Sequence, residues 1–164
     1  MHPRRLRRLP RHCYTGFARY AVTFCARHRR SVFTDAPLVN LVLTQILRTA
    51  SSSSFDVVAY CCMPDHLHLL VEATAETASL LEFVKDAKQC SSFHAKVLLG
   101  APLWQVGYFE RVLRSDEDTR AVARYILQNP VRAGLVKDAC EYRFSGSARY
   151  SVRQIVEWVQ DPIH

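Results

Sequence analysis

The chain has 164 residues, of which 49% are hydrophobic, and it carries a formal net charge of +7. This length and apolar content predict one globular domain, because two halves of this size would each bury too little surface. No run of about 18 apolar residues occurs, which argues against a membrane span, and the basic N-terminus is not followed by a secretory apolar region. We expect one cytoplasmic domain over residues 1–164, with a basic arm at 1–15 and a C-terminal helix at 150–164.

The positive charge is concentrated in two arginine clusters. Lys and Arg outnumber Asp and Glu by 22 to 15. Concentrated positive charge suits a polyanion, since neutralising phosphates releases counterions. A merely solvated basic tail is the alternative for the first cluster. The predicted DNA-contacting residues are Arg4, Arg5, Arg7, Arg8 and Arg11 in the first cluster and Arg27, Arg29 and Arg30 in the second.

The six cysteines do not have the C-x-x-C spacing of a zinc knuckle. Two of them, Cys61 and Cys62, are adjacent within an apolar segment. We therefore expect reduced core thiols, as in a cytosolic protein, rather than a disulfide framework.

The first half of the chain predicts a strand, a helix and a hairpin. Residues 19–26 alternate in hydropathy as a strand does. Asp35 begins a helix that ends at the serine run 51–54. Residues 55–62 and 66–72 are two strands whose short connection indicates an antiparallel hairpin.

The second half predicts three helices and one strand. A long helix covers about 77–99, and a strand interrupted by a glycine covers 104–113. An acidic start opens a helix over about 115–128, and the Asn129-Pro130 pair that follows discourages helix at Asn129. A last helix lies near 152–160. The order is the split β-α-β pattern of an α+β, ferredoxin-like fold, with helices on one face of a mostly antiparallel sheet and the other face open for ligand or core helices.

His66 and His68 are one residue apart within a predicted strand. Successive strand side chains point to opposite faces, so both imidazoles project from the same side. Histidines at such positions are often hydrogen-bonded structural residues, but the neighbouring sequence is apolar and unpaired imidazoles would be costly to desolvate. The pair therefore indicates half of a metal site.

Tyr125 and Asn129 are four residues apart and share one face of the helix that follows the acidic start. If that face meets the histidine strand, two imidazoles and an amide oxygen can hold a divalent cation that polarises a phosphodiester, and the phenol can attack phosphorus. Without the histidines, Tyr125 would be read as an ordinary half-buried helix aromatic.

Three ordered motifs carry a family resemblance. They are MPDHLHLL at 63–70, LWQ at 103–105 with GYF at 107–109, and ARYI at 123–126 running into NPVRAGLV at 129–136. Together they resemble the REP-associated tyrosine transposases, which are domesticated relatives of single-tyrosine HUH transposases. The similarity extends over about residues 19–150. Val106 stands where many relatives have an arginine, a departure that concerns a DNA contact or an ion pair rather than the metal site.

The resemblance implies a role for each matching position. His66 and His68 match the histidines that bind Mg or Mn, and Asn129 matches a third polar ligand. Tyr125 matches the nucleophile that cuts single-stranded DNA and stays joined to the 5′ phosphate, leaving a 3′ hydroxyl. The implied substrates are hairpins of palindromic repeats in a bacterial genome, held in part by the basic N-terminal arm. Relatives act as monomers or as dimers that share sites, and we favour a monomer.

Two other functions use some of the same features. A metal phosphohydrolase that activates water would use the histidines, although such sites usually contain more carboxylates than Asp65 alone supplies. A non-catalytic nucleic-acid binder is also compatible with a ferredoxin-like sheet. Substituting Tyr125 distinguishes all three, because only the transposase needs the phenol to form a covalent adduct.

Overall fold

The computed structural model describes residues 9–10, 14–114 and 117–157. Five strands form one antiparallel sheet in the spatial order β4-β1-β3-β2-β5. Their bounds are Arg19–Cys25 for β1, Phe55–Met63 for β2, His66–Ala73 for β3, Phe109–Val112 for β4 and Ser145–Gly146 for β5. The order of the first four strands is that of a split β-α-β unit, which confirms the predicted α+β, ferredoxin-like class.

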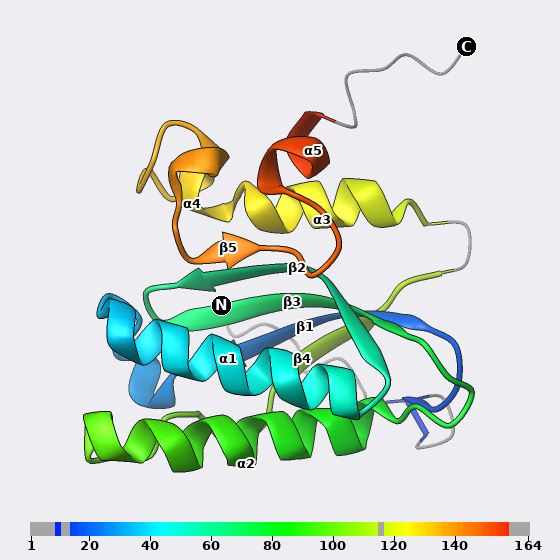
Figure 1. Cartoon of the computed structure of the whole chain (residues 1–164), viewed down its shortest axis with the longest axis horizontal. Coiled ribbons are helices and arrows are strands. Elements are labelled where there is room, and N and C mark those ends of the chain that lie inside the picture. The colour runs from blue at the N-terminus through cyan, green and yellow to red at the C-terminus, as the bar shows by residue number, and fades with distance from the viewer. Residues whose placement is uncertain (1–8, 11–13, 115–116, 158–164) are drawn as a thin grey trace.

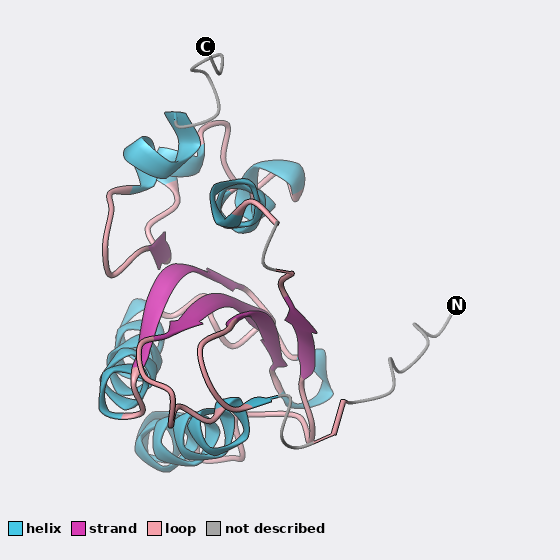
Figure 2. Cartoon of the chain, turned by 90° about the vertical axis from the view of Figure 1, so that its right-hand side faces the viewer, coloured by secondary structure: helices cyan, strands magenta, loops and turns pink. Residues whose placement is uncertain are grey.

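Helices cover both faces of this sheet (Figures 1 and 2). One face carries α1 (Ala36–Ser52) and α2 (Leu80–Leu99), as predicted. The opposite face, which the sequence left open for ligand or core helices, carries α3 (Thr119–Leu127) with the shorter α4 (Asn129–Arg132) and α5 (Val152–Glu157). In the connections between the described elements lie the short 3-10 helices η2 (Arg27–Arg29) and η3 (Ala139–Glu141).

The alternation of side chains along β3 divides the apolar interior into two cores. Leu67 and Leu69 pack in the larger core together with residues of α1 and α2. Leu70 packs in a second core with Ala123 and Leu127 of α3. Because the even-numbered residues of β3 share one face, His66 and His68 lie on the side of the sheet that carries α3.

Local signals mark the start of both long helices and the end of α2. Helix α1 starts after Asp35 and has a proline in its first turn, as expected. Helix α2 starts later than predicted because Ser79 is its N-cap and accepts a hydrogen bond from the backbone of Glu82. It ends at Gly100, whose φ of +67° is the left-handed conformation that favours glycine.

The strand predicted at 104–113 is shorter in the structure. Only Phe109–Val112 form β4, while Trp104 makes an isolated bridge with Ala26. Gly107 separates the two at a φ of +83°, which breaks the extended conformation. The last helix ends at Glu157 within the described residues, and the predicted positions 158–160 lie outside them.

The proline after α3 does not prevent helix at Asn129, contrary to our expectation. Helix α4 begins at that residue and has Pro130 in its first turn. The first N–H groups of a helix have no partner within it, so a proline there removes no hydrogen bond of α4. The chain therefore starts a new helical turn directly after α3.

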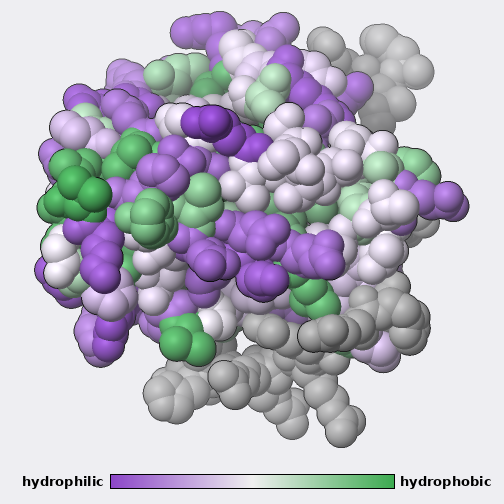
Figure 3. All heavy atoms as spheres, turned by 60° about the horizontal axis from the view of Figure 1, so that its bottom comes forward, coloured by the Kyte–Doolittle hydropathy of each residue, from purple (hydrophilic) through white to green (hydrophobic). Residues whose placement is uncertain are grey.

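The outer surface of α2 is mostly hydrophilic, with apolar side chains gathered at one side (Figure 3). Exposed apolar residues of its C-terminal half include Phe93, Val97 and Leu98. No helix in the part of the chain that the structure describes combines the length and hydrophobicity needed to cross a bilayer. The five described cysteines are free thiols.

Candidate active site

The two histidines of β3 point their Nε2 atoms at each other, 3.0 Å apart. The remaining nitrogen of each ring is held from a different direction. Asp65 Oδ1 lies 2.6 Å from Nδ1 of His66, and Thr23 Oγ1 of β1 lies 3.0 Å from Nδ1 of His68. Such outer contacts fix the orientation and tautomer of an imidazole that uses its other nitrogen as a ligand.

Arg29 supports this arrangement through Asp65. Its Nε donates to Asp65 Oδ2 at 2.9 Å, while the other carboxylate oxygen faces His66. Burial alone would raise the pKa of Asp65, but the hydrogen bonds from His66 and Arg29 outweigh it and lower that pKa overall. His28 and Arg29 adopt left-handed φ values of 57° and 53°, which cost a non-glycine residue about 1 kcal/mol or more each.

The predicted DNA-contacting arginines fall into two groups in the structure. Arg27, Arg29 and Arg30 are exposed on and beside η2, where Arg29 is engaged by Asp65. The residues of the first cluster, Arg4, Arg5, Arg7, Arg8 and Arg11, lie outside the described residues. Contact of either group with DNA stays a prediction.

His68 is held in its neutral form at pH 7. Burial, followed by the neighbouring His66 and the charges of Arg132 and Arg29, lowers its pKa from 6.5 to about 4. A neutral imidazole is the form that binds a metal ion, so no proton has to leave His68 before it can act as a ligand.

This shift predicts that the protein becomes less stable in mild acid. Between pH 6.5 and pH 4 the unfolded chain binds a proton at this position that the folded chain does not, so stability is present above this window and falls as the pH is lowered through it. Without added divalent cation, His68 alone should make the free energy of unfolding about 2 kcal/mol lower at pH 5 than at pH 7. Urea unfolding at the two pH values measures the difference. His68→Gln should remove it and His94→Gln should not; equal pH dependence in all three proteins would contradict the assignment.

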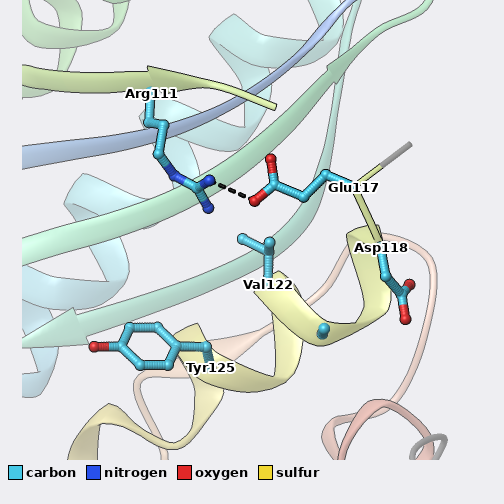
Figure 4. A pocket seen from close by; sticks show the side chains of 6 residues that line it. Arg111, Glu117, Asp118, Val122 and Tyr125 are labelled. Carbon is cyan, nitrogen blue, oxygen red and sulfur yellow. Dashed lines mark hydrogen bonds and ion pairs between the residues drawn. The ribbon is translucent and has the colours of Figure 1, made fainter. Parts of the chain in front are cut away.

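Tyr125 lies on α3, with 65% of its surface exposed. Figure 4 shows its hydroxyl pointing away from Glu117 and Asp118, at the edge of a pocket of about 220 Å³. The pocket is bordered on the strand side by Arg111 of β4, which forms an ion pair with Glu117 (Figure 4). The phenol is thus accessible to a ligand, while Ala123 and Leu127 of the same helix anchor α3 to the sheet.

Asn129 lies four residues further on, with both ends of its side-chain amide engaged. Nδ2 donates to the carbonyl of Ile126 at 3.0 Å, and Oδ1 accepts from Arg132 at 2.9 Å. Pro130 has no N–H to offer this carbonyl, and the amide of Asn129 supplies a donor in its place. An amide oxygen has two lone pairs, so its bond with Arg132 leaves one for a further partner.

Arg132 is the residue of this region that sequence reasoning missed. Its guanidinium carbon lies 3.9 Å from the ring centroid of Tyr125, and one guanidinium nitrogen donates to the Tyr125 carbonyl at 2.7 Å as well as to Asn129. Arg132 is seven residues, or about two helical turns, after Tyr125, a spacing that places two residues on the same side of a continuous helix. Because we expected the helix to end before Pro130, this spacing did not point to Arg132.

The structure brings the predicted residues to one side of the sheet without direct contact between the two halves. Among the described residues, neither Tyr125 nor Asn129 hydrogen-bonds to His66 or His68. No cluster of three or more His, Cys, Asp and Glu suited to a metal ion occurs in the same part of the chain. A third protein ligand would therefore have to be a group such as the Asn129 amide.

The loop of the tryptophan motif lies on the α2 side of the sheet. Trp104 donates from Nε1 to Ser91 Oγ at 2.9 Å, and Lys88 donates to the carbonyls of Gln105 and Gly107 at 2.8 and 2.6 Å. Val106 between these carbonyls is 96% exposed. The departure at this position therefore places an apolar side chain on the surface and leaves the histidine pair untouched.

Residues 17–129 match the family model described as "Transposase IS200 like". The chain belongs to this transposase family. A Haemophilus influenzae protein assigned to the REP-associated tyrosine transposases is 26% identical over 149 residues, covering 83% of each chain. The REP-associated tyrosine transposase of Escherichia coli is 29% identical over 121 residues, covering 71% of this chain and 70% of that protein.

The fold comparison agrees with the sequence comparison. The solved structure of a REP-associated tyrosine transposase bound to a REP hairpin superposes with a TM-score of 0.70 at 23% identity, covering 85% of this chain and 80% of that one. This likeness confirms the fold, while the match to the family model and the two REP-associated relatives confirm the family predicted from the three motifs. The roles of His66, His68, Tyr125 and Asn129 within this transposase stay predictions. Arg132 lies beyond the span that the family model matches.

Proposed function

We propose that this transposase cuts and rejoins single-stranded DNA at palindromic repeat hairpins through a 5′-phosphotyrosine intermediate. The observation that carries the proposal is the placement of a preorganised histidine pair on the same side of the sheet as the helix that presents an exposed tyrosine. A phosphodiester lying between them would be within reach of both a cation and a nucleophile.

The histidine pair fits a divalent cation, Mg or Mn. Because the Asp65 carboxylate can only accept, Nδ1 of His66 is the donor, and in neutral His66 the Nε2 atom presents a lone pair toward His68. That lone pair needs a proton or a cation. The two Nε2 atoms lie 3.0 Å apart, so both imidazoles could serve as ligands of one cation. Asn129 Oδ1 is the third candidate ligand. Such an ion would polarise the phosphodiester.

The protein's own part in the reaction is carried by Tyr125. Its phenol gives up a proton, its Oη forms a bond to phosphorus, and the bond from phosphorus to the 3′ oxygen breaks, so that this oxygen takes up a proton as a 3′ hydroxyl. The product is a phosphodiester between tyrosine and the 5′ end of the released strand. Because one phosphodiester replaces another, the reverse attack by a 3′ hydroxyl can rejoin strands without ATP.

Hairpin DNA is the substrate that the comparisons favour. The relative of similar fold is bound to a REP hairpin, and the two curated relatives are REP-associated transposases. The net charge of +7 suits a nucleic-acid ligand, and the exposed Arg27 and Arg30 lie at the end of β1 near the histidine pair, since Cys25 is the register partner of His66. We propose that a monomer acts on such hairpins in the bacterial cytoplasm.

An adduct assay with end-labelled DNA tests the proposal. Single-stranded hairpins taken from DNA beside the gene are incubated with protein and Mn²⁺ or Mg²⁺, then separated on a denaturing gel. A 3′ label should migrate with the protein, and a 5′ label should be released on a fragment that ends in a 3′ hydroxyl. Chelator should abolish both products, and fully duplex DNA should be cut poorly. Binding without cleavage across all hairpins and both metals would contradict the proposal.

A further inference from the structure

The guanidinium of Arg132 contacts both the helix that carries Tyr125 and the amide of Asn129. It covers one face of the Tyr125 ring at 3.9 Å and donates to both the Tyr125 carbonyl and Asn129 Oδ1. One side chain therefore holds both the candidate nucleophile and a candidate ligand. Arginine suits this task because its planar cation can stack on a ring and donate in several directions at once.

The helix that carries Arg132 also packs on the sheet. Helix α4, whose last residue is Arg132, contacts β2 on the face of the sheet that carries α3. His68 and Cys61 are register partners on β3 and β2. Arg132 thus lies on the side of the sheet that carries the histidine pair, although the pair and the phenol make no direct contact.

A simpler role for Arg132 is to cap α3. The last carbonyls of a helix have no partner within it, and arginine side chains often satisfy them. The bond to the Tyr125 carbonyl fits such a role. The stack on the ring and the bond to Asn129 Oδ1 do not, because neither group is a helix-end carbonyl.

We propose that Arg132 is a positioning residue for strand cleavage, whose guanidinium holds the Tyr125 ring and the Asn129 oxygen in one fixed arrangement on the histidine side of the sheet. The inference rests on the proposed phosphotyrosine reaction and adds to it a residue outside the matched family span. Without the guanidinium the exposed phenol rotates freely, and the fraction of time it spends aligned for attack falls.

The test compares Arg132→Ala and Arg132→Lys with the wild type in single-turnover adduct formation at saturating hairpin and Mn²⁺. Removing an orienting partner of this kind costs about 10- to 100-fold in rate, and we expect a loss in that range for the alanine variant. The lysine variant should recover little, since an ammonium group cannot stack in the same way. Hairpin affinity should change less than about 3-fold, and millimolar ethylguanidinium should partly restore the alanine variant. Lys137→Ala, which removes an exposed charge shortly after α4, is the matched control and should react normally.

A second readout does not depend on catalysis. In protein with ¹³C-labelled tyrosine rings, the resonances of Tyr125, identified by their absence in Tyr125→Phe, should shift in both Arg132 variants and stay in place in Lys137→Ala. Unchanged Tyr125 resonances would overturn the inference. So would full rescue by lysine, or a rate loss that only follows a loss of thermal stability, because either result indicates a helix cap. A wild type that forms no adduct would overturn the proposed function itself, and an active wild type matched by Arg132→Ala would overturn this inference alone.

Discussion

Replacing Tyr125 with phenylalanine should eliminate the covalent protein–DNA adduct and release no nicked product. The substitution removes one oxygen atom, and in the proposed reaction that oxygen is the only atom of the enzyme that bonds to phosphorus. We expect adduct formation to fall by at least about 10³-fold, as for the loss of other nucleophiles. Because the side chain is 65% exposed, the free energy of unfolding should change by no more than about 0.5 kcal/mol.

This variant also distinguishes the three functions compatible with the sequence. A water-activating phosphohydrolase would still cut the hairpin after losing Tyr125, and a non-catalytic binder would show no cleavage in either protein. Tyr150→Phe is the matched control, since that tyrosine is also partly exposed and lies outside the proposed site. Hairpin binding by all three proteins should agree within about 3-fold. Continued nicking by Tyr125→Phe would exclude the phosphotyrosine mechanism.

Removing either histidine of the pair should abolish the response to divalent cation. His66→Ala or His68→Ala leaves one imidazole, and the described residues nearby offer no cluster of His, Cys, Asp and Glu to replace the lost ligand. We expect adduct formation below detection, a loss of at least about 10³-fold. Manganese binding in the presence of hairpin, followed by electron paramagnetic resonance, measures the cation directly and separates a lost metal site from a lost DNA site.

Substitutions of the residues that contact the Nδ1 atoms of the two histidines should have smaller effects than loss of the histidines themselves. Thr23→Val removes only the group that faces Nδ1 of His68, and Asp65→Asn weakens the hold on His66. Changes of this type reduce metal affinity or activity by about 10- to 100-fold and do not abolish it. Manganese affinity that is unchanged in His66→Ala and His68→Ala would show that the cation binds elsewhere.

The sequence predicted most of the elements and the face on which the histidines lie. The two-residue period of β3 is strict, so placing His66 and His68 opposite Leu67 and Leu69 required only a correct strand assignment. The start of α1 after Asp35 was also predicted, although the Asp35 side chain makes no capping hydrogen bond. The acidic start located α3 only approximately, because Asp118, the last of its residues, is the N-cap and the helix begins at Thr119. Features set by short-range sterics and hydrogen bonds could be predicted in this way.

What the sequence did not reveal depends on contacts between distant segments. Nothing local to Arg29 indicates that a left-handed turn directs it to Asp65, 36 residues away, and its charge suggested only DNA. Helix α3 lies on the face opposite α1 and α2 because its apolar side chains pack against Leu70 and the other residues of the second core. Arg132 was missed for a different reason, because a proline that permits a new helical turn was read as the end of helix.

Pro130 influences the orientation of the Asn129 amide through the N–H group that proline lacks. A residue with an N–H at that position could donate to the Ile126 carbonyl itself, and Arg132 alone would then hold the orientation of the Asn129 amide. With proline there, the NH₂ end of the amide is drawn to the carbonyl, so the oxygen faces the opposite way. The missing backbone N–H of Pro130 thereby helps to orient the amide of the preceding residue, Asn129, so that its oxygen is turned away from the Ile126 carbonyl.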